Sequence, residues 1–156
     1  MKLKQKYWNF LILAIATVTL WLNIFVTSQT VAKAVSIKEE IAQMVARQAQ
    51  AWENQDVRAI SRDFAPDALF IAAGFRFEGK GQIENAARDY FKQFDNTSVE
   101  IKRIIVDGQQ GAVEWNWQDR NRQSGKKGYA EDAIVFELKN EKIIYWREYI
   151  EKKKSL

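Results

Sequence analysis

The sequence predicts an α+β domain in which helices precede a sheet of sequential hairpins. Between residues 36 and 94 apolar side chains recur mostly every three or four positions, which is typical of amphipathic helices. From residue 98 onward apolar and polar residues alternate, as they do in half-buried strands, and Gly, Asn and Asp interrupt the alternation. Sequential hairpins form an antiparallel meander, so we expect the helices to cover one of its faces.

The first 34 residues differ from the rest and predict an export signal. Lys2, Lys4 and Lys6 precede a mostly apolar stretch over residues 7–26, and the small residues Ala32 and Ala34 follow it. This order is typical of a secretory signal peptide cleaved after Ala34. The apolar stretch is also long enough to remain as a membrane anchor.

Both alternatives predict the same location for the domain. The lysines stay on the cytoplasmic side, so the remainder lies outside as a periplasmic, secreted or outward-facing anchored domain. We therefore divide the chain into a signal peptide or anchor, 1–34, and one domain, 35–156. Contact with a membrane is expected only through residues 7–26, and only if they are not cleaved.

Composition narrows the possible functions. Four lysines and no acidic residue lie in 1–34, which leaves 20 basic and 20 acidic residues of the 24 and 20 in the whole chain. A domain without net charge gives no reason to expect a nucleic-acid partner. The chain contains no Cys and no His. Disulfides, thiolate catalysis and the commonest metal ligand are therefore excluded, and we expect no metal and no cofactor.

Three helices are predicted before the meander. Ser36 and Glu39 form a capping box for a helix that ends near Asn54. Asp56 can cap a second, short helix that carries Ile60 and Phe64 and is closed by Pro66. A third helix has one apolar side, formed by Ile83, Ala86, Ala87, Tyr90, Phe91 and Phe94.

Six strands are predicted in two groups. A small pair over residues 68–73 and 75–78 precedes the third helix, with Gly74 between the two. Four longer strands follow it, at 98–106, 112–120, 129–138 and 142–151. The turns between the longer strands contain Asp107-Gly108, Ser124-Gly125 and Asn140.

Several short stretches in this order resemble the nuclear transport factor 2-like superfamily and, within it, the SnoaL-like group. They are Trp52-Glu53-Asn54-Gln55-Asp56, Phe64-Ala65-Pro66-Asp67-Ala68, Phe77-Glu78-Gly79-Lys80 with Ile83, Val135-Phe136-Glu137-Leu138, Lys142-Ile143 and Trp146-Arg147-Glu148-Tyr149. The resemblance implies a cone-like domain in which a curved antiparallel sheet wraps around a long N-terminal helix and leaves a pocket at its open end. It implies no single reaction, because the superfamily includes isomerases, dehydratases, epoxide hydrolases, cyclases and non-catalytic modules.

Of two enzyme patterns within this superfamily, one is missing at all three functional positions and the other is only partly present. Gln48, Ala72 and Ile134 stand where the ketosteroid isomerase pattern has a tyrosine and two aspartates. The limonene epoxide hydrolase pattern has an acid on the last strand, where Glu148 stands here. Its Arg-x-Asp step is replaced by Trp115-Asn116-Trp117.

Strand alternation predicts which side chains line the inner face of the sheet. If Glu148 points inward, Ile144 and Trp146 do too, together with Asp132, Ile134, Phe136 and Leu138 on the preceding strand. Val113, Trp115 and Trp117 face the same way. The candidate catalytic residues are Glu148 and Asp132, and the candidate ligand pocket comprises Trp52, Phe70, Trp115, Trp117, Ile134, Phe136 and Trp146.

Two carboxylates in apolar surroundings can act as acid and base, because burial and mutual repulsion separate their pKa values. The alternative is structural: Glu148 pairs with Arg76 or Arg120, Asp132 lies in water at a strand end, and the tryptophans are core.

The sequence thus supports three functions for an exported SnoaL-like domain. The first is binding of a small apolar or aromatic molecule, and the second is catalysis by a cofactor-free lyase, isomerase or hydrolase. The third is an interaction module in the cell envelope. We also predict a homodimer, because Ile143, Tyr145 and Tyr149 would leave an apolar patch on the outer face.

Overall fold

The computed structural model describes residues 29–30 and 37–153. The predicted leader, with its apolar stretch and its Ala32 and Ala34 step, lies outside these residues, as does Ser36 of the predicted capping box. No helix within the described residues is both long and apolar enough to span a membrane. The chain divides into two compact units between residues 37 and 38, and the second unit is described below.

Three helices occur in the predicted order. Residues 37–53 are helical, followed by α2 (Val57–Arg62) and α3 (Lys80–Gln93). Asp56 caps α2 as predicted, because its side chain accepts a hydrogen bond of 2.9 Å from the backbone N–H of Ala59. The prediction that this helix carries Phe64 and ends at Pro66 was wrong, since the helix ends at Arg62 and both residues belong to the first strand.

Six strands form one sheet with the order β2-β1-β6-β5-β4-β3. Their bounds are β1 (Phe64–Ala72), β2 (Phe75–Glu78), β3 (Phe94–Asp107), β4 (Gln110–Asn121), β5 (Lys127–Lys139) and β6 (Lys142–Lys153). The four longer strands form the predicted antiparallel meander. The sheet is mixed rather than wholly antiparallel, because β1 pairs in parallel with β6. Pro66 is tolerated in β1 within a stretch where this pairing is interrupted between Phe64 and Leu69.

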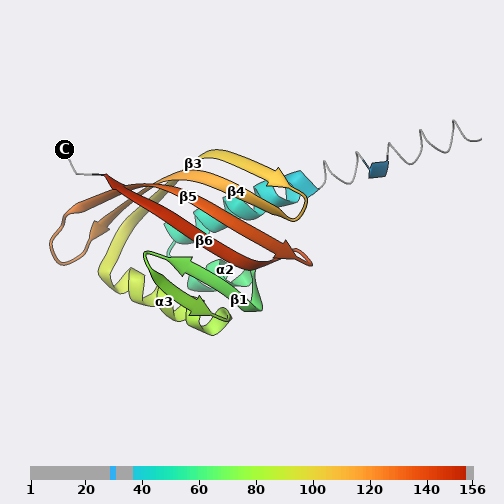
Figure 1. Cartoon of the computed structure of the whole chain (residues 1–156). Helices are drawn as coiled ribbons and strands as arrows, with labels where there is room; N and C mark the ends of the chain where they lie inside the picture. The colour runs from blue at the N-terminus through green and yellow to red at the C-terminus, as the bar shows by residue number, and fades with distance from the viewer. Residues whose placement is uncertain (1–28, 31–36, 154–156) are drawn as a thin grey trace, which may run out of the picture. The chain divides into compact units, whose positions relative to one another are not determined.

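The sheet curves around the helices to give the predicted cone-like α+β fold (Figure 1). The helix over residues 37–53 buries Ile41, Met44, Val45 and Gln48 almost completely. Its Trp52 contacts Phe91 of α3 and Trp117 of β4, with ring centroids 5.4 and 5.5 Å apart. The core therefore lies between this helix and the inner, concave face of the sheet.

One β-bulge changes which residues of β6 face inward. The register shifts between Glu137 and Leu138, which pair with Tyr145 and Ile143, so that Ile144 is an extra residue in β6. Ile143 is therefore completely buried, and Ile144 is only half-buried. The prediction that Ile143 faces outward was wrong, and Ile144, predicted to face inward, has no cross-strand partner on β5. From Tyr145 onward the alternation is as predicted.

Candidate functional site

Strand register brings Asp132 and Glu148 together on the inner face of the sheet. Glu148 of β6 pairs with Ile134 of β5, and Asp132 lies two residues before Ile134. Cross-strand partners and residues two apart share a face, so the two carboxylates are diagonal neighbours. Trp115 of β4 is the partner of Asp132 in the other direction.

Asp132 is a buried carboxylate with one oxygen unsatisfied. The residue is 6% exposed, and its Oδ2 accepts a hydrogen bond of 3.1 Å from Trp115 Nε1–H. Its Oδ1 is buried and meets no donor among the described residues. Burial disfavours the charged form and raises the pKa of Asp132 to about 6, although the hydrogen bond from Trp115 opposes the shift.

Glu148 is held in a similar way from the next strand. Its Oε1 accepts a hydrogen bond of 2.9 Å from Nε1–H of Trp146, two residues earlier on the same face of β6. Burial raises the pKa of Glu148 to about 8; the negative charge of Asp132 adds to the rise, and the bond from Trp146 opposes it. At neutral pH the pair therefore holds at least one proton, most of it on Glu148.

The two carboxylates have no basic partner among the described residues. Both arginines proposed as structural partners of Glu148 are engaged elsewhere, Arg76 with Glu78 at 2.7 Å and Arg120 with Asp95 at 2.8 Å. Asp132 is buried rather than in water at a strand end. The structural alternative for the two acids was therefore wrong in both its parts.

The predicted pocket residues form one packed aromatic cluster behind the carboxylates. Trp115 and Trp146 are each 1% exposed, and their ring centroids lie 5.9 Å apart. Phe136 stacks on Trp146 at 5.8 Å, and Phe70 contacts Phe64 at 6.0 Å. Ile134, Phe136, Phe70 and Trp52 are also buried. Most of the predicted pocket residues are thus core, and Trp117 alone among them is half-buried.

Partly exposed apolar side chains adjoin the carboxylates on the same face. Ile101 of β3, Trp115, Asp132 and Ile150 of β6 form one row across the sheet. Ile101 and Ile150 are half-buried, as is Trp117 in the adjacent row. The carboxylates therefore adjoin an inner surface that the helices leave partly uncovered.

Comparison with known proteins identifies the family. The SnoaL-like domain family matches residues 45–146, which include Asp132 and the aromatic cluster and end two residues before Glu148. The chain belongs to the SnoaL-like family. No curated protein matches it by sequence.

Solved structures share the fold of this SnoaL-like domain at low sequence identity. A protein with a ketosteroid isomerase-like fold from Catenulispora acidiphila, solved with trimethylamine, has a TM-score of 0.64 at 20% identity, covering 68% of this chain and 83% of its own. An LEH-like epoxide hydrolase from M. tuberculosis has a TM-score of 0.64 at 22% identity, covering 72% and 84%. An NTF2-like protein of unknown function from Burkholderia pseudomallei has a TM-score of 0.65 at 13% identity, covering 72% and 91%. These similarities establish the fold.

A second polar cluster on the inner face of the SnoaL-like domain was missed by the sequence analysis. Tyr90 of α3 donates a hydrogen bond of 2.7 Å to Asp119 Oδ2, and Trp117 Nε1–H donates to Tyr90 Oη at 3.0 Å. Burial raises the pKa of Tyr90 above its ordinary value, and its bond to Asp119 adds to the rise. Gly128 leaves room opposite Asp119, because a Cβ there would force the Asp119 carboxylate to shift. The sequence signal for this cluster was a tryptophan followed two residues later by an acid on the same strand face. Trp117 and Asp119 have this spacing, and so do Trp146 and Glu148.

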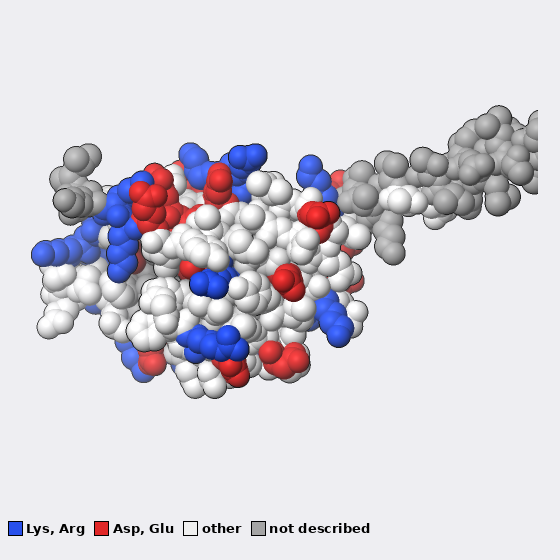
Figure 2. Space-filling view, in the orientation of Figure 1, with Lys and Arg blue, Asp and Glu red and all other residues white. Residues whose placement is uncertain are grey.

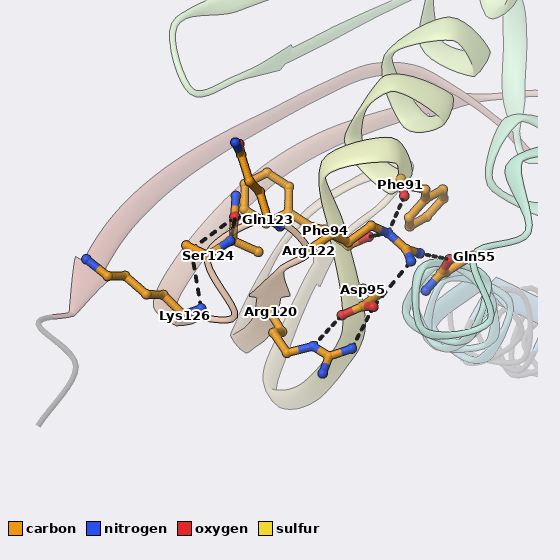
Figure 3. A network of polar contacts seen from close by, with 10 residues as sticks. Gln55, Phe91, Phe94, Asp95, Arg120, Arg122, Gln123, Ser124 and Lys126 are labelled. Atoms are coloured by element: carbon orange, nitrogen blue, oxygen red, sulfur yellow. Dashed lines mark hydrogen bonds and ion pairs between the residues drawn. The ribbon is translucent and has the colours of Figure 1, made fainter.

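A third cluster joins α3 to the ends of β3 and β4 in this SnoaL-like domain (Figure 3). Asp95 accepts two hydrogen bonds of 2.8 Å from Arg120 and lies 3.3 Å from Arg122. Arg122 also donates to the backbone oxygens of Phe91 and Phe94, at 2.9 and 3.2 Å. Asp95 is paired with two guanidinium groups, and Arg122 also bonds to backbone oxygens of two elements, so this cluster is structural.

The outer face of the sheet carries scattered charges with uncharged surface between them (Figure 2). Ile105, Val135 and Tyr149 are 48%, 43% and 52% exposed, and they lie on β3, β5 and β6. Ile105 and Val135 both pair with Ala112 of β4, so they belong to one row. Tyr149 is covered in part by Arg147, whose guanidinium lies 4.9 Å from the ring centroid.

Proposed function

We propose that this SnoaL-like domain binds a small, largely apolar or aromatic molecule against the inner face of its sheet. Asp132 and Glu148 would contact the polar group of that molecule, and Ile101, Trp117 and Ile150 its apolar part. The observation that carries the proposal is the buried, unpartnered Oδ1 of Asp132, which adjoins partly exposed apolar side chains. A buried acceptor without a donor is unfavourable, and a ligand that supplies the donor removes the penalty.

The packed aromatic cluster supports the proposal, because it holds the two carboxylates in place. Trp115 and Trp146 hold one oxygen of each carboxylate through their indole N–H groups. Their rings are buried and in contact, so the orientation of the acceptors is fixed before a ligand arrives. Preorganised polar groups in an apolar wall are the usual composition of small-molecule sites.

A test of binding uses the full chain purified from the host that makes it. Native mass spectrometry should show a small molecule bound to the wild type. Asp132→Asn keeps an acceptor for Trp115 but changes the charge and the free oxygen, so the bound fraction should fall at least tenfold. Glu114→Gln, an exposed change on the outer face of β4, should retain the ligand. Equal occupancy in both variants would contradict the proposal.

Acid–base catalysis is a second candidate, favoured by the different pKa values of the two carboxyl groups. With values of about 6 and about 8, Asp132 is mostly ionised at pH 7 while Glu148 is mostly protonated. One group could then accept a proton and the other donate one, as a cofactor-free lyase, isomerase or hydrolase requires. Retention of the bound molecule by Glu148→Gln with loss of its conversion to product would support catalysis. Unchanged conversion would exclude Glu148 as the acid.

We also retain export and dimerisation as proposals. The basic start, apolar stretch and small-residue step of residues 1–34 support export, and N-terminal sequencing would distinguish a mature Val35 from a retained anchor. The exposed Ile105, Val135 and Tyr149 support a symmetric dimer through the outer sheet face. Tyr149→Glu should then halve the sedimentation mass, and an unchanged mass would contradict this interface.

A further inference from the structure

The absence of a cation beside the carboxylate pair indicates what kind of ligand the site accepts. Within residues 37–153 no lysine or arginine forms an ion pair with Asp132 or Glu148, although other acids of this segment do form such pairs, for example Asp63 with Arg47 and Asp95 with Arg120. Arg147, between Trp146 and Glu148 in sequence, points to the opposite face and covers Tyr149. A buried and a half-buried carboxylate side by side without a counter-charge are unfavourable unless a proton or a bound cation neutralises them.

We propose that Asp132 and Glu148 form the anionic half of a binding site for a small organic cation, an alkylammonium group on an apolar or aromatic body. This inference rests on the proposed function and specifies the ligand class for the same site. The unpartnered Oδ1 of Asp132 and the adjoining carboxyl of Glu148 supply the negative charge. Half-buried Ile101, Trp117 and Ile150 adjoin them for the apolar body.

The surroundings favour an organic cation over a metal ion. The described residues contain no group of three or more acidic side chains placed to hold a metal. A hard cation such as Ca²⁺ takes six or more oxygen ligands, whereas an alkylammonium group needs only a few acceptors and apolar contact for its methyl groups. Indole rings also attract organic cations through their faces, and the half-buried Trp117 is the most accessible tryptophan of the cluster.

The other charged groups near the pair do not replace such a cation. Asp119 of β4 and Tyr90 of α3 share the inner face but bond to each other. Asp63, between α2 and β1, is bonded to Arg47 and Gln48 of the long helix. Lys152 of β6 pairs with Ala130 on the same face, is exposed and forms no ion pair with Asp132. Burial is therefore the main influence on the pKa values of Asp132 and Glu148, and the charge of Asp132 adds to it at Glu148.

Binding of a cation to these carboxyls should depend on pH in one direction. A cation favours the ionised forms of both carboxyls, so binding releases protons and strengthens as the pH rises through about 6 and about 8. A probe with a fixed charge assigns this dependence to the protein alone.

Choline and its neutral isostere 3,3-dimethylbutan-1-ol separate charge from shape, because they differ by a quaternary nitrogen in place of a carbon. Titration calorimetry with the full chain should show choline binding at pH 8.5 at least tenfold more tightly than the alcohol, and this preference should disappear at pH 5. Asp132→Asn and Glu148→Gln should each reduce the preference at pH 8.5 at least threefold. Glu114→Gln, which removes an exposed carboxylate from the outer face, should leave it unchanged.

Failure of the cation inference and failure of the proposed binding function would give different results. Equal binding of choline and the alcohol, with no dependence on pH, would overturn the inference but leave the proposed apolar site standing. Binding of neither probe at millimolar concentration would count against both. A preference for choline that survives both carboxylate variants but is lost in Glu114→Gln would place the cation on the outer face and overturn the inference.

Discussion

Acidic side chains at two places on the same sheet have opposite surroundings. Asp95 receives two hydrogen bonds from Arg120 and an ion pair from Arg122, and the arginine hydrogen bonds hold its pKa below the usual range (Figure 3). Asp132 and Glu148 receive one indole N–H each, and burial raises their pKa values. The first arrangement joins secondary-structure elements. The second leaves negative charge and an open acceptor inside the domain, which is the arrangement expected of a site rather than of a support.

Removal of the indole behind the pair should have the largest effect on stability. Trp115 is 1% exposed and contacts the rings of Trp117 and Trp146. Trp115→Ala should lower the free energy of unfolding by about 3–5 kcal/mol, because it leaves a large cavity. Trp115→Phe retains most of the volume but removes the donor to Asp132, and should cost about 1–3 kcal/mol. Urea denaturation measures both, and a loss below about 1 kcal/mol for Trp115→Ala would show that this cluster is not core.

The pH dependence of stability should distinguish the two groups of acids by its sign. The folded domain holds protons on Asp132 and Glu148 more tightly than the unfolded chain does, so stability should fall as the pH rises from about 4 through about 6 and about 8. Asp95 contributes in the opposite sense, since its pKa is lowered, and its contribution is present above its ordinary value of 3.8 and lost in acid.

The variants that test this sign are Asp132→Asn and Asp95→Asn. For Asp132, the shift from 3.8 to about 6 corresponds to up to about 3 kcal/mol. The fall in the free energy of unfolding between pH 4 and 8 should therefore be smaller by up to that amount in Asp132→Asn, as measured by denaturation at each pH. Asp95→Asn should leave the decline in place. A wild-type stability that rises throughout this interval would contradict the assigned surroundings of the pair.

Disruption of the arginine cluster should have a smaller effect that depends on salt. Arg122→Ala removes the donors to Phe91 and Phe94 and the ion pair with Asp95, and should cost about 1–2 kcal/mol, because the side chain is 43% exposed. Arg88→Ala is the matched control on α3, where an exposed pair with Glu84 contributes about 0.3–0.5 kcal/mol. If the two losses were equal, Arg122 would not be the structural link that the geometry indicates.

Local sequence patterns predicted most of the helices and strands, and they predicted which face of the sheet carries the candidate site. Alternation along β5 and the second half of β6 placed Asp132, Ile134 and Glu148 on one face, because the side-chain period of a strand is fixed at two. The turn residues Gly108 and Asn140 have positive φ values of 60° and 51°, which is why they separated the strands correctly.

The failures have physical causes that a local pattern does not record. The bulge beside Leu138 depends on how two strands fit each other, and it placed Ile143 in the core rather than on the outer face. The parallel pairing of β1 with β6 joins segments about 80 residues apart in sequence. The backbone oxygens that Arg122 binds belong to Phe91 of α3 and Phe94 at the start of β3, and no spacing near the end of β4 predicts them.

The central claim is that Asp132 and Glu148 lie in the domain as an uncompensated pair, and titration of their own carboxyl carbons tests it most directly. In ¹³C NMR of the full chain, assigned with Asp132→Asn and Glu148→Gln, one carboxyl should titrate near pH 6 and the other near pH 8. Removal of Asp132 should lower the midpoint of Glu148, because a charge that helps to raise it is gone. Two midpoints below pH 5, each unaffected by loss of the other acid, would contradict the claim.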